Sequence, residues 1–281
     1  MIEGQGRFGV SVVAVCRRLR MSRQNFYFRR KQRERRGVDE DLVVALVQRE
    51  RQLQTRLGTR KLWGMLQKDL AEAGVTIGRD RLFDVLRQRE LLVPPSIAEF
   101  PRTTNSHHYL PVFTNRIKDL EVKRPNEVWV ADITYLRTEA GFLYLALLTD
   151  KVSRNGYHCG DSLESEGCLR ALEKALRDLP AGAHPIHHSD RGSQYCCHRY
   201  VDRLRERGLS ISMTEVDHCA ENALAERMNG ILKSEYGLGR EFRTQADAHL
   251  AVDQAVHLYN TRRPHTALKF RVPAEVHSLA A

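Results

Sequence analysis

The sequence lacks any apolar run close to the ~20 residues that a transmembrane helix needs, and its first residues contain no signal-peptide core. Its six cysteines are scattered, without C-x-x-C spacing, over 281 residues, a length that forms hydrophobic cores without disulfides. These absences argue against a membrane protein, a secreted disulfide-rich domain and a structural zinc site. They favour a cytoplasmic protein that makes no membrane contact.

Acidic residues are scarce in the first part of the chain. Residues 1–120 contain 24 Lys and Arg but 13 Asp and Glu, a net charge of +11, whereas residues 121–281 have a net charge of −1. A basic excess confined to one region is typical of a protein that binds nucleic acid. The alternative is a surface whose charge only makes the protein soluble.

Residues 11–35 predict a helix-turn-helix, because Ser11 and Ser22 can each cap a short helix. Residues 17–36 contain ten Lys and Arg and a single acid, with aromatic residues between them. In a DNA-binding helix-turn-helix the second helix enters the major groove, and the alternative is a solvated basic helix. The candidate DNA contacts on this helix are Arg23, Arg29 and Arg30.

The pattern divides the chain into four parts. Residues 1–37 form the basic helix-turn-helix-like segment, and residues 38–93 form a second helical DNA-binding domain with three amphipathic helices. Residues 94–126 are expected to be a linker, because regular patterning fades and prolines cluster there. Residues 127–281 form the remaining domain.

That last domain predicts a mixed five-stranded α/β sheet. Apolar alternation indicates strands at residues 127–138 and 142–149, and Asn155-Gly156 indicates a hairpin turn before a short third strand at 157–160. Two further strands, at residues 185–189 and 209–213, alternate with helices and are therefore expected to be parallel.

Two acids occupy unusual positions in this sheet. Asp132 lies among apolar residues in the first strand, and Asp190 follows the fourth strand. If these strands are neighbours, the two carboxylates lie side by side, and a divalent cation is the usual relief of their repulsion. The ordinary alternatives are a salt bridge for Asp132 and a helix cap for Asp190.

A third acid lies on a polar helical stripe. Asn222, Glu226, Asn229 and Lys233 recur at i, i+4, i+7 and i+11, which places them on one side of a helix. Such stripes are usually only solvated. Carboxylate sites built from oxygen ligands suit Mg²⁺ or Mn²⁺ rather than zinc.

Four ordered motifs carry a family resemblance. With 57 residues between Asp132 and Asp190, and 35 between Asp190 and Glu226, the chain resembles DDE transposases of bacterial insertion sequences. It is most similar to the second reading-frame (OrfB) product of the IS-three family, which has a retroviral-integrase-like catalytic core. The motifs are Trp129–Tyr135, His188–Tyr195, Glu221–Arg227 and Tyr259–His265.

The resemblance implies a ribonuclease-H-like fold in which Asp132, Asp190 and Glu226 are the catalytic residues and hold two Mg²⁺ or Mn²⁺ ions. It implies cleavage of double-stranded DNA at the element's ends and strand transfer into target DNA, in a nucleoid-associated bacterial protein. Self-association on DNA and a first-frame partner or fusion are further implications. The residues implied in DNA binding are Asn222, Lys233, Arg262, Arg263 and His265, of which the last three could instead brace the core.

Two departures from the family pattern keep other functions open. The predicted third strand is about two residues short, and Glu221 takes a position usually held by Asp. The alternative to a transposase is therefore a catalytically impaired DNA-binding regulator of its own element. A ribonuclease-H-type nuclease that only hydrolyses its substrate is a third possibility.

Overall fold

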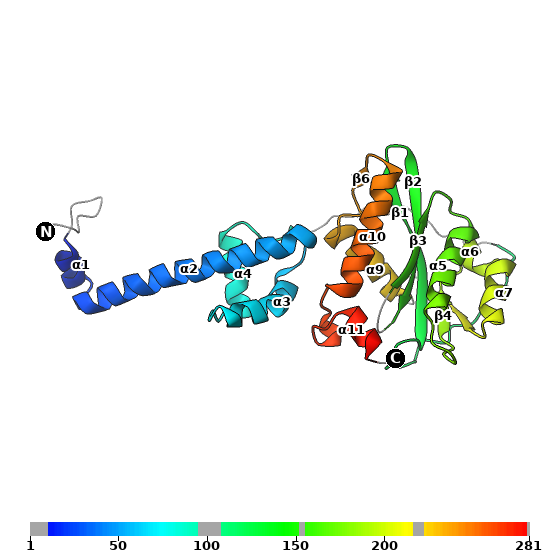
Figure 1. Ribbon diagram of the computed structural model, residues 1–281, viewed down its shortest axis with the longest axis horizontal. Helices are drawn as coiled ribbons and strands as arrows, with labels where there is room; N and C mark the ends of the chain where they lie inside the picture. Colours follow the sequence, from blue (N-terminus) through cyan, green and yellow to red (C-terminus); the bar gives the residue numbers. More distant parts are fainter. Residues whose placement is uncertain (1–10, 95–107, 152–154, 216–221, 280–281) are drawn as a thin grey trace.

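The computed structural model describes residues 11–94, 108–151, 155–215 and 222–279. A long helical arm extends from an α/β domain, and the N-terminal helix lies at the far end of the arm (Figure 1). The arm contains α1 (Val12–Arg18), α2 (Arg23–Leu53), α3 (Thr59–Glu72) and α4 (Arg79–Gln88). No helix among the described residues is both long enough and apolar enough to span a bilayer.

The first two helices begin where the sequence predicted. The Ser11 hydroxyl accepts the Ala14 N–H at 3.3 Å, and the Ser22 hydroxyl accepts the Asn25 N–H at 3.1 Å. α2 then continues through Gly37 for 31 residues. A glycine inside a helix costs only about 1 kcal/mol, and the three residues before it, Glu34, Arg35 and Arg36, are strong helix formers.

The second half of α2 packs with α3 and α4 around a small apolar core of its own. Val47, Leu62 and Leu82 are completely buried in this core. The N-terminal half of α2 projects beyond it, so the boundary predicted at residues 37–38 falls within a continuous helix. Within the predicted linker, residues 108–126 lie on the α/β domain: Ile117 is buried there, and the Arg116 N–H donates to Ser212 Oγ at 2.8 Å.

The α/β domain is built on a mixed sheet in the order β3-β2-β1-β4-β5, with a short β6 paired to the far end of β1. β1, β2 and β3 are antiparallel, whereas β4 and β5 run parallel to β1. This is the ribonuclease-H-like architecture that was predicted, with one additional two-residue strand. The strands are β1 (Val128–Thr138), β2 (Gly141–Asp150), β3 (Asn155–Gly160), β4 (Ile186–Ser189), β5 (Ser210–Met213) and β6 (Glu241–Phe242).

The hairpin predicted at Asn155-Gly156 was wrong. These two residues pair with Thr149 and Leu148 and extend β3 to six residues. A side chain at Gly156 would meet the Ala175 methyl at 3.3 Å, so this glycine permits close packing of a helix on the strand and does not form the turn. The third strand is therefore longer than the sequence pattern suggested.

Helices cover both faces of the sheet (Figure 1). One face packs against α5, α6 and α7, of which the last two are separated at Cys197. The other face packs against α9 and α10. The helices are α5 (Ser165–Arg177), α6 (Ser193–Cys196), α7 (His198–Glu206), α9 (Ala223–Glu235), α10 (Gln245–Thr261) and α11 (Pro273–Ser278), with a 3₁₀ turn η1 (Thr266–Leu268) before the last.

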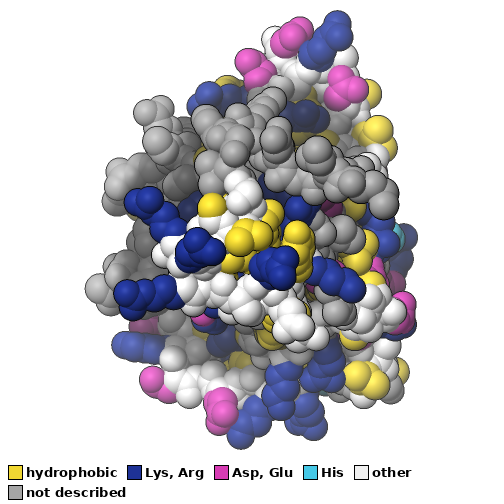
Figure 2. Space-filling view, turned by 90° about the vertical axis from the view of Figure 1, so that its left-hand side faces the viewer, with side chains coloured by type: hydrophobic (Ala, Val, Ile, Leu, Met, Phe, Trp, Pro, Cys, Tyr) yellow, Lys and Arg dark blue, Asp and Glu magenta, His cyan; other side chains and the backbone are white. Residues whose placement is uncertain are grey.

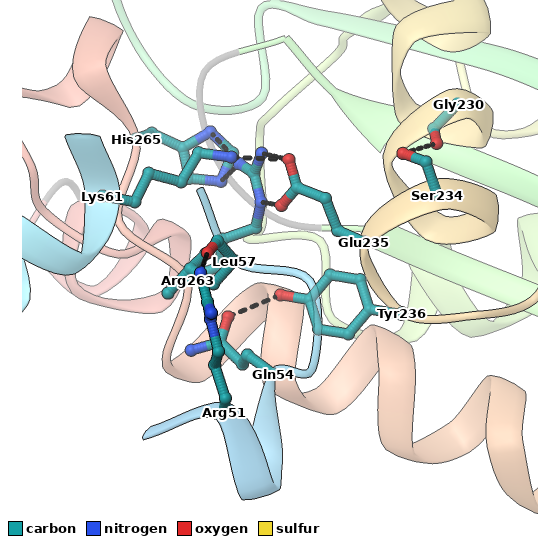
Figure 3. Close-up of polar contacts among 10 residues, drawn as sticks. All are labelled: Arg51, Gln54, Leu57, Lys61, Gly230, Ser234, Glu235, Tyr236, Arg263 and His265. Carbon is teal, nitrogen blue, oxygen red and sulfur yellow. Dashed lines mark hydrogen bonds and ion pairs between the residues drawn. The ribbon is translucent and has the colours of Figure 1, made fainter. Parts of the chain in front are cut away.

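The helical arm contacts the α/β domain through the C-terminal end of α2 and through α3. A side chain at Gly64 of α3 would approach the Phe270 ring to 2.6 Å. Glycine at this position therefore lets α3 pack closely against Phe270 of the α/β domain. Tyr236, which follows α9, donates its hydroxyl to Gln54 Oε1 of the arm at 3.0 Å. Figure 3 shows this junction in detail.

Candidate active site

The sheet register brings the first two acids together. Val130 of β1 lies opposite His188 of the parallel strand β4, and the same offset places Asp132 opposite Asp190. Asp132 lies within β1, on the side of the sheet covered by α9, and Asp190 is the first residue after β4. Asp190, at the carboxyl end of β4, therefore lies beside Asp132 of the central strand β1.

The surroundings of Asp132 destabilise its ionised form. Its Oδ1 accepts the Ile133 N–H at 2.9 Å, and its Oδ2 accepts the Asn229 side-chain N–H at 2.7 Å. Burial and repulsion from Asp190, with a smaller contribution from Glu226, nevertheless raise the pKa of Asp132 to about 7. Desolvation and like charge outweigh the two hydrogen bonds, so the ionised carboxylate favours a cation as its neighbour.

Asp190 is oriented by the loop that follows it. The Gly192 N–H donates to Asp190 Oδ1 at 3.0 Å, and a side chain at residue 192 would approach that same oxygen to 3.0 Å. Arg191 donates its Nε–H to the Thr214 carbonyl at 2.6 Å, which ties the loop to the end of β5. The Gly-containing turn thus holds the carboxylate at the edge of the sheet.

The strand that precedes Asp190, β4, contains two buried histidines that contact neighbouring elements. Nδ1 of His188 lies 2.9 Å from Ser212 Oγ on β5, and the Tyr200 hydroxyl lies 2.9 Å from Nε2 of His187. Burial lowers the pKa of His187 to about 3, so its ring is neutral at ordinary pH. These histidines serve as packing groups.

Helix α9 presents the polar stripe that the sequence predicted. Asn222 donates to the Ala131 carbonyl at 3.3 Å, next to Asp132, whereas Glu226 is exposed at the start of the helix. Lys233 Nζ lies 4.1 Å from the centre of the Tyr135 ring, and burial lowers the pKa of Lys233 to about 8, partly offset by attraction to Asp132. Asn222 and Lys233, at the two ends of the stripe, therefore lie against β1.

Asn229 was placed on this stripe but was not recognised as a site residue. It is 7 % exposed and contacts Asp132 directly. Its own Oδ1, like the Oδ1 of Asn222, is buried and has no hydrogen-bond partner among the described residues. The detectable signal was the spacing, since position i+3 from Glu226 on a helix lies on the same side as Glu226.

The described residues contain no group of three or more His, Cys, Asp or Glu side chains already arranged to hold a metal ion. Asp132 and Asp190 are adjacent, whereas the Glu226 side chain is exposed, and the three carboxylates do not form such a group. The donor set nevertheless fits a hard cation, because it combines a carboxylate whose pKa is raised with two unpaired amide oxygens. Cations of this kind prefer oxygen ligands of these types.

The C-terminal candidates lie at the junction with the helical arm. Arg263 is 3 % exposed, and its Nε and Nη2 donate to the Glu235 carboxylate at 2.8 and 3.0 Å (Figure 3). Arg262 makes a two-point contact with Glu50 of α2 at 2.9 and 2.7 Å. Burial and the charge of Arg263 lower the pKa of His265 to about 3. The ion pairs of Arg262 and Arg263 are those expected if these residues brace the structure.

The N-terminal candidates are placed differently. Arg23, Arg29 and Arg30 are exposed on the projecting part of α2. Figure 2, which views the molecule from the end of the arm, shows hydrophobic side chains at the centre with Lys and Arg around them. Leu19, Tyr27 and Phe28 are among the exposed large hydrophobic residues of this end. A surface that combines exposed aromatics and arginines suits contact with DNA.

Comparison with known proteins gives a consistent result. Two family models described as integrase core domain match residues 122–219 and 207–273. The chain is 34 % identical over 277 residues to the insertion element IS600 uncharacterized 31 kDa protein of Shigella sonnei, covering 95 % of this chain and 100 % of that protein. It is 33 % identical over 224 residues to the transposase for insertion sequence element IS629 of the same organism, covering 78 % and 72 %.

Among solved structures, the chain is similar to the HTLV-2 integrase catalytic core domain in complex with magnesium. The TM-score is 0.46 at 18 % sequence identity, over 56 % of this chain and 99 % of that one.

Proposed function

Because the chain belongs to the transposases of bacterial insertion sequences that contain an integrase core domain, we propose that Asp132, Asp190 and Glu226 form its catalytic site. The protein acts in transposition and DNA integration. In the proposed reaction it cuts DNA at the ends of its element and joins those ends to target DNA. The observation that supports this assignment best is the sheet register, which places Asp132 beside Asp190.

Two divalent ions, Mg²⁺ or Mn²⁺, would supply activation of the attacking oxygen and stabilisation of the leaving oxygen in line with it. Asp132 and Asp190 would hold them from adjacent strands, and Glu226 would complete the ligand set from α9. Asn229 keeps the Asp132 carboxylate in place through its 2.7 Å hydrogen bond. The buried amide oxygen of Asn222 lies on the same side of the helix and provides a further polar group.

In this proposal the site catalyses two related phosphoryl transfers. In cleavage, a water oxygen attacks phosphorus at the element's end, the bond to the 3′ oxygen breaks, and a 3′-hydroxyl is released. In joining, that 3′-hydroxyl attacks a phosphodiester of target DNA, and the target strand leaves with its own 3′-hydroxyl. The chain's residues orient the carboxylates and contribute no covalent nucleophile.

DNA contacts are assigned to two regions. Near the catalytic site, Asn222 and Lys233 extend along α9, where a DNA strand at Glu226 would pass. On the arm, Arg23, Arg29 and Arg30 are exposed and would hold phosphates. Arg262, Arg263 and His265 remain candidates, but their ion pairs favour a role in which they position the DNA-binding parts. Two element ends require two copies of the chain, so self-association on DNA is part of the proposal.

The alternative, a catalytically impaired regulator, was motivated by the basic N-terminal region and by a short third strand. β3 has six residues and pairs with β2 over its whole length, which weakens the second of these reasons. DNA joining also distinguishes a transposase from a nuclease that only hydrolyses its substrate.

The test is cleavage and joining of a duplex carrying the element's end, with Mg²⁺, using Asp132→Ala and Glu226→Ala. Both variants are expected to lose cleavage and joining while retaining DNA binding. Glu139→Gln, which changes an exposed acid in the turn between β1 and β2, is the matched control and should remain active. Activity close to wild type in either triad variant would overturn the assignment.

A further inference from the structure

A cavity of about 130 Å³ lies between the helical arm and the α/β domain. Its apolar wall includes Met228 and Ile231 of α9 and Tyr259 of α10. Lys61 of α3 lines the opposite wall. Glu226 and Arg227 are consecutive on α9, so their side chains leave the helix about 100° apart. The catalytic site and this cavity therefore lie on different sides of one helix.

Cationic side chains outnumber acids around the cavity. Among the described residues it is lined by Lys61, Lys151, Arg227 and Arg263, and by a single acid, Asp150. Glu235 lies beside the cavity, and its carboxylate is shared by Lys61 at 2.7 Å and Arg263 at 2.8 Å (Figure 3). One carboxylate thus serves two cations, which leaves a positive charge uncompensated there.

The other two cations face solvent. Lys151 and Arg227 are both exposed, and neither forms an ion pair with any acid among the described residues. Repulsion by Arg263 and Arg227 adds to burial in lowering the pKa of Lys61. A partly enclosed space with surplus positive charge attracts an anion.

A buried hydroxyl completes the cavity. Thr149 of β2 lines it and is 4 % exposed, and its Oγ1 has no hydrogen-bond partner among the described residues. A buried hydroxyl without a partner costs roughly 1–3 kcal/mol, which a ligand that accepts its proton would recover. The hydroxyl is the specific donor, and the surrounding cations provide the charge.

We propose that this cavity binds a backbone phosphate of the DNA, with Arg227 and Lys151 pairing to its oxygens and the Thr149 hydroxyl donating to one of them. The proposal rests on the function proposed above, because it takes DNA as the ligand. DNA is favoured over an acidic segment of a second protein copy because Arg227 directly follows Glu226. A strand that reaches the catalytic carboxylate presents its next phosphates within a few ångströms along its backbone.

The consequence is a single DNA strand held on both sides of α9. Because Lys61 belongs to the arm and Arg227 to the α/β domain, the phosphate would also bridge the two parts of the molecule. Binding of DNA and docking of the arm would then support each other.

The test measures binding of a fluorescent element-end duplex by anisotropy across a salt series, using the full chain without divalent ions. Arg227→Gln combined with Lys151→Gln is expected to weaken binding several-fold. It is also expected to reduce the slope of log affinity against log salt by about 1, the value for one phosphate contact. Arg243→Gln combined with Lys118→Gln changes two exposed cations elsewhere on the same domain and serves as the control.

Thr149→Val is the second, independent variant, because it replaces a buried hydroxyl by a methyl group of similar size. It is expected to weaken DNA binding about threefold while leaving the unfolding temperature unchanged or higher. Binding by Thr149→Val equal to that of wild type, or a double variant indistinguishable from the control, overturns the phosphate site. Free inorganic phosphate is included as a competitor, and displacement of DNA at millimolar phosphate would assign the cavity to a free anion instead.

Sedimentation of the same variants decides the protein alternative. Weaker self-association with unchanged DNA binding means that the cavity takes an acidic side chain of a second copy, which also overturns the proposal. Failure of the phosphate site is distinguishable from failure of the proposed function, because wild-type cleavage and joining with Mg²⁺ are measured separately. If the wild type cleaves and joins DNA while the cavity variants bind DNA as the wild type does, the phosphate site is wrong and the transposase assignment is retained.

Discussion

Two charged regions lie on different sides of helix α9, and they differ in the sign of their surplus. On one side Asp132 and Asp190 are adjacent, and burial and repulsion raise the pKa of Asp132 to about 7. On the other side Lys61 and Arg263 share Glu235, and their hydrogen bonds and charges lower the pKa of Glu235 although burial alone would raise it. In the first region two carboxylates repel each other, whereas in the second a carboxylate is stabilised by two cations.

This difference indicates what each region is built to receive. Two like charges held close together are retained at a cost in stability, which is typical of functional sites. An acidic surplus favours cations, and a basic surplus favours phosphate. The same helix would therefore hold the two chemical components that phosphoryl transfer on DNA requires, and substitutions on each side should give different kinds of effect.

The largest effect is expected on the acidic side. Asp190→Asn should lower cleavage and joining more than about 10³-fold, or roughly 4 kcal/mol of transition-state stabilisation, because an amide lacks the negative charge with which a carboxylate holds a divalent cation. DNA affinity should stay the same or increase, since a negative charge near the phosphates is removed. Gel assays of cleavage and anisotropy of binding check the two parts, and equal loss of both would indicate a folding defect instead.

On the basic side the largest expected effect is on stability. Arg263→Met leaves Glu235 buried with a single partner, and we expect a loss of about 3 kcal/mol in the free energy of unfolding, measured with urea. Arg199→Met is the control, because Arg199 forms an exposed ion pair with Glu166 and should cost less than about 1 kcal/mol. Equal costs for the two variants would show that the junction is no stronger than a surface pair.

The pH dependence of stability sharpens the comparison further. An acid whose pKa is about 7 in the folded chain, against 3.8 in the unfolded chain, destabilises the fold as pH rises through that interval. Asp132→Asn should therefore be more stable than wild type at pH 8 without metal, by up to about 4 kcal/mol, and the difference should vanish below about pH 3. Unfolding curves at both pH values provide the measurement. A difference independent of pH would contradict the burial and repulsion of the Asp132 carboxylate as its cause.

The smallest effect tests the contact between the arm and the domain. Alanine usually stabilises a helix relative to glycine by about 0.5–1 kcal/mol, and Gly230→Ala in α9 should do so because its new methyl group meets nothing. Gly64→Ala in α3 should instead lose about 1 kcal/mol, because the methyl group would approach Phe270 to 2.6 Å. A stabilised Gly64→Ala variant would mean that Phe270 moves aside freely.

Much of the fold was predictable because it depends on local patterns. Ser11 and Ser22 cap their helices, and the alternation around Asp132 identified the central strand. The error at Asn155-Gly156 occurred where packing decides the outcome. These residues join the strand, and Gly156 packs against Ala175. That contact is not visible in local propensity.

The sequence by itself determined the motifs: two acids at strand positions, a third on a helix, and a family resemblance that relates them. Their roles as ligands remain a proposal. Only the tertiary structure decided that Asn229 contacts Asp132, that Arg263 is paired with Glu235, and that Thr149 lines a cation-rich cavity. Charge effects depend on distance and burial between residues far apart in the chain, and those quantities exist only once the chain is folded.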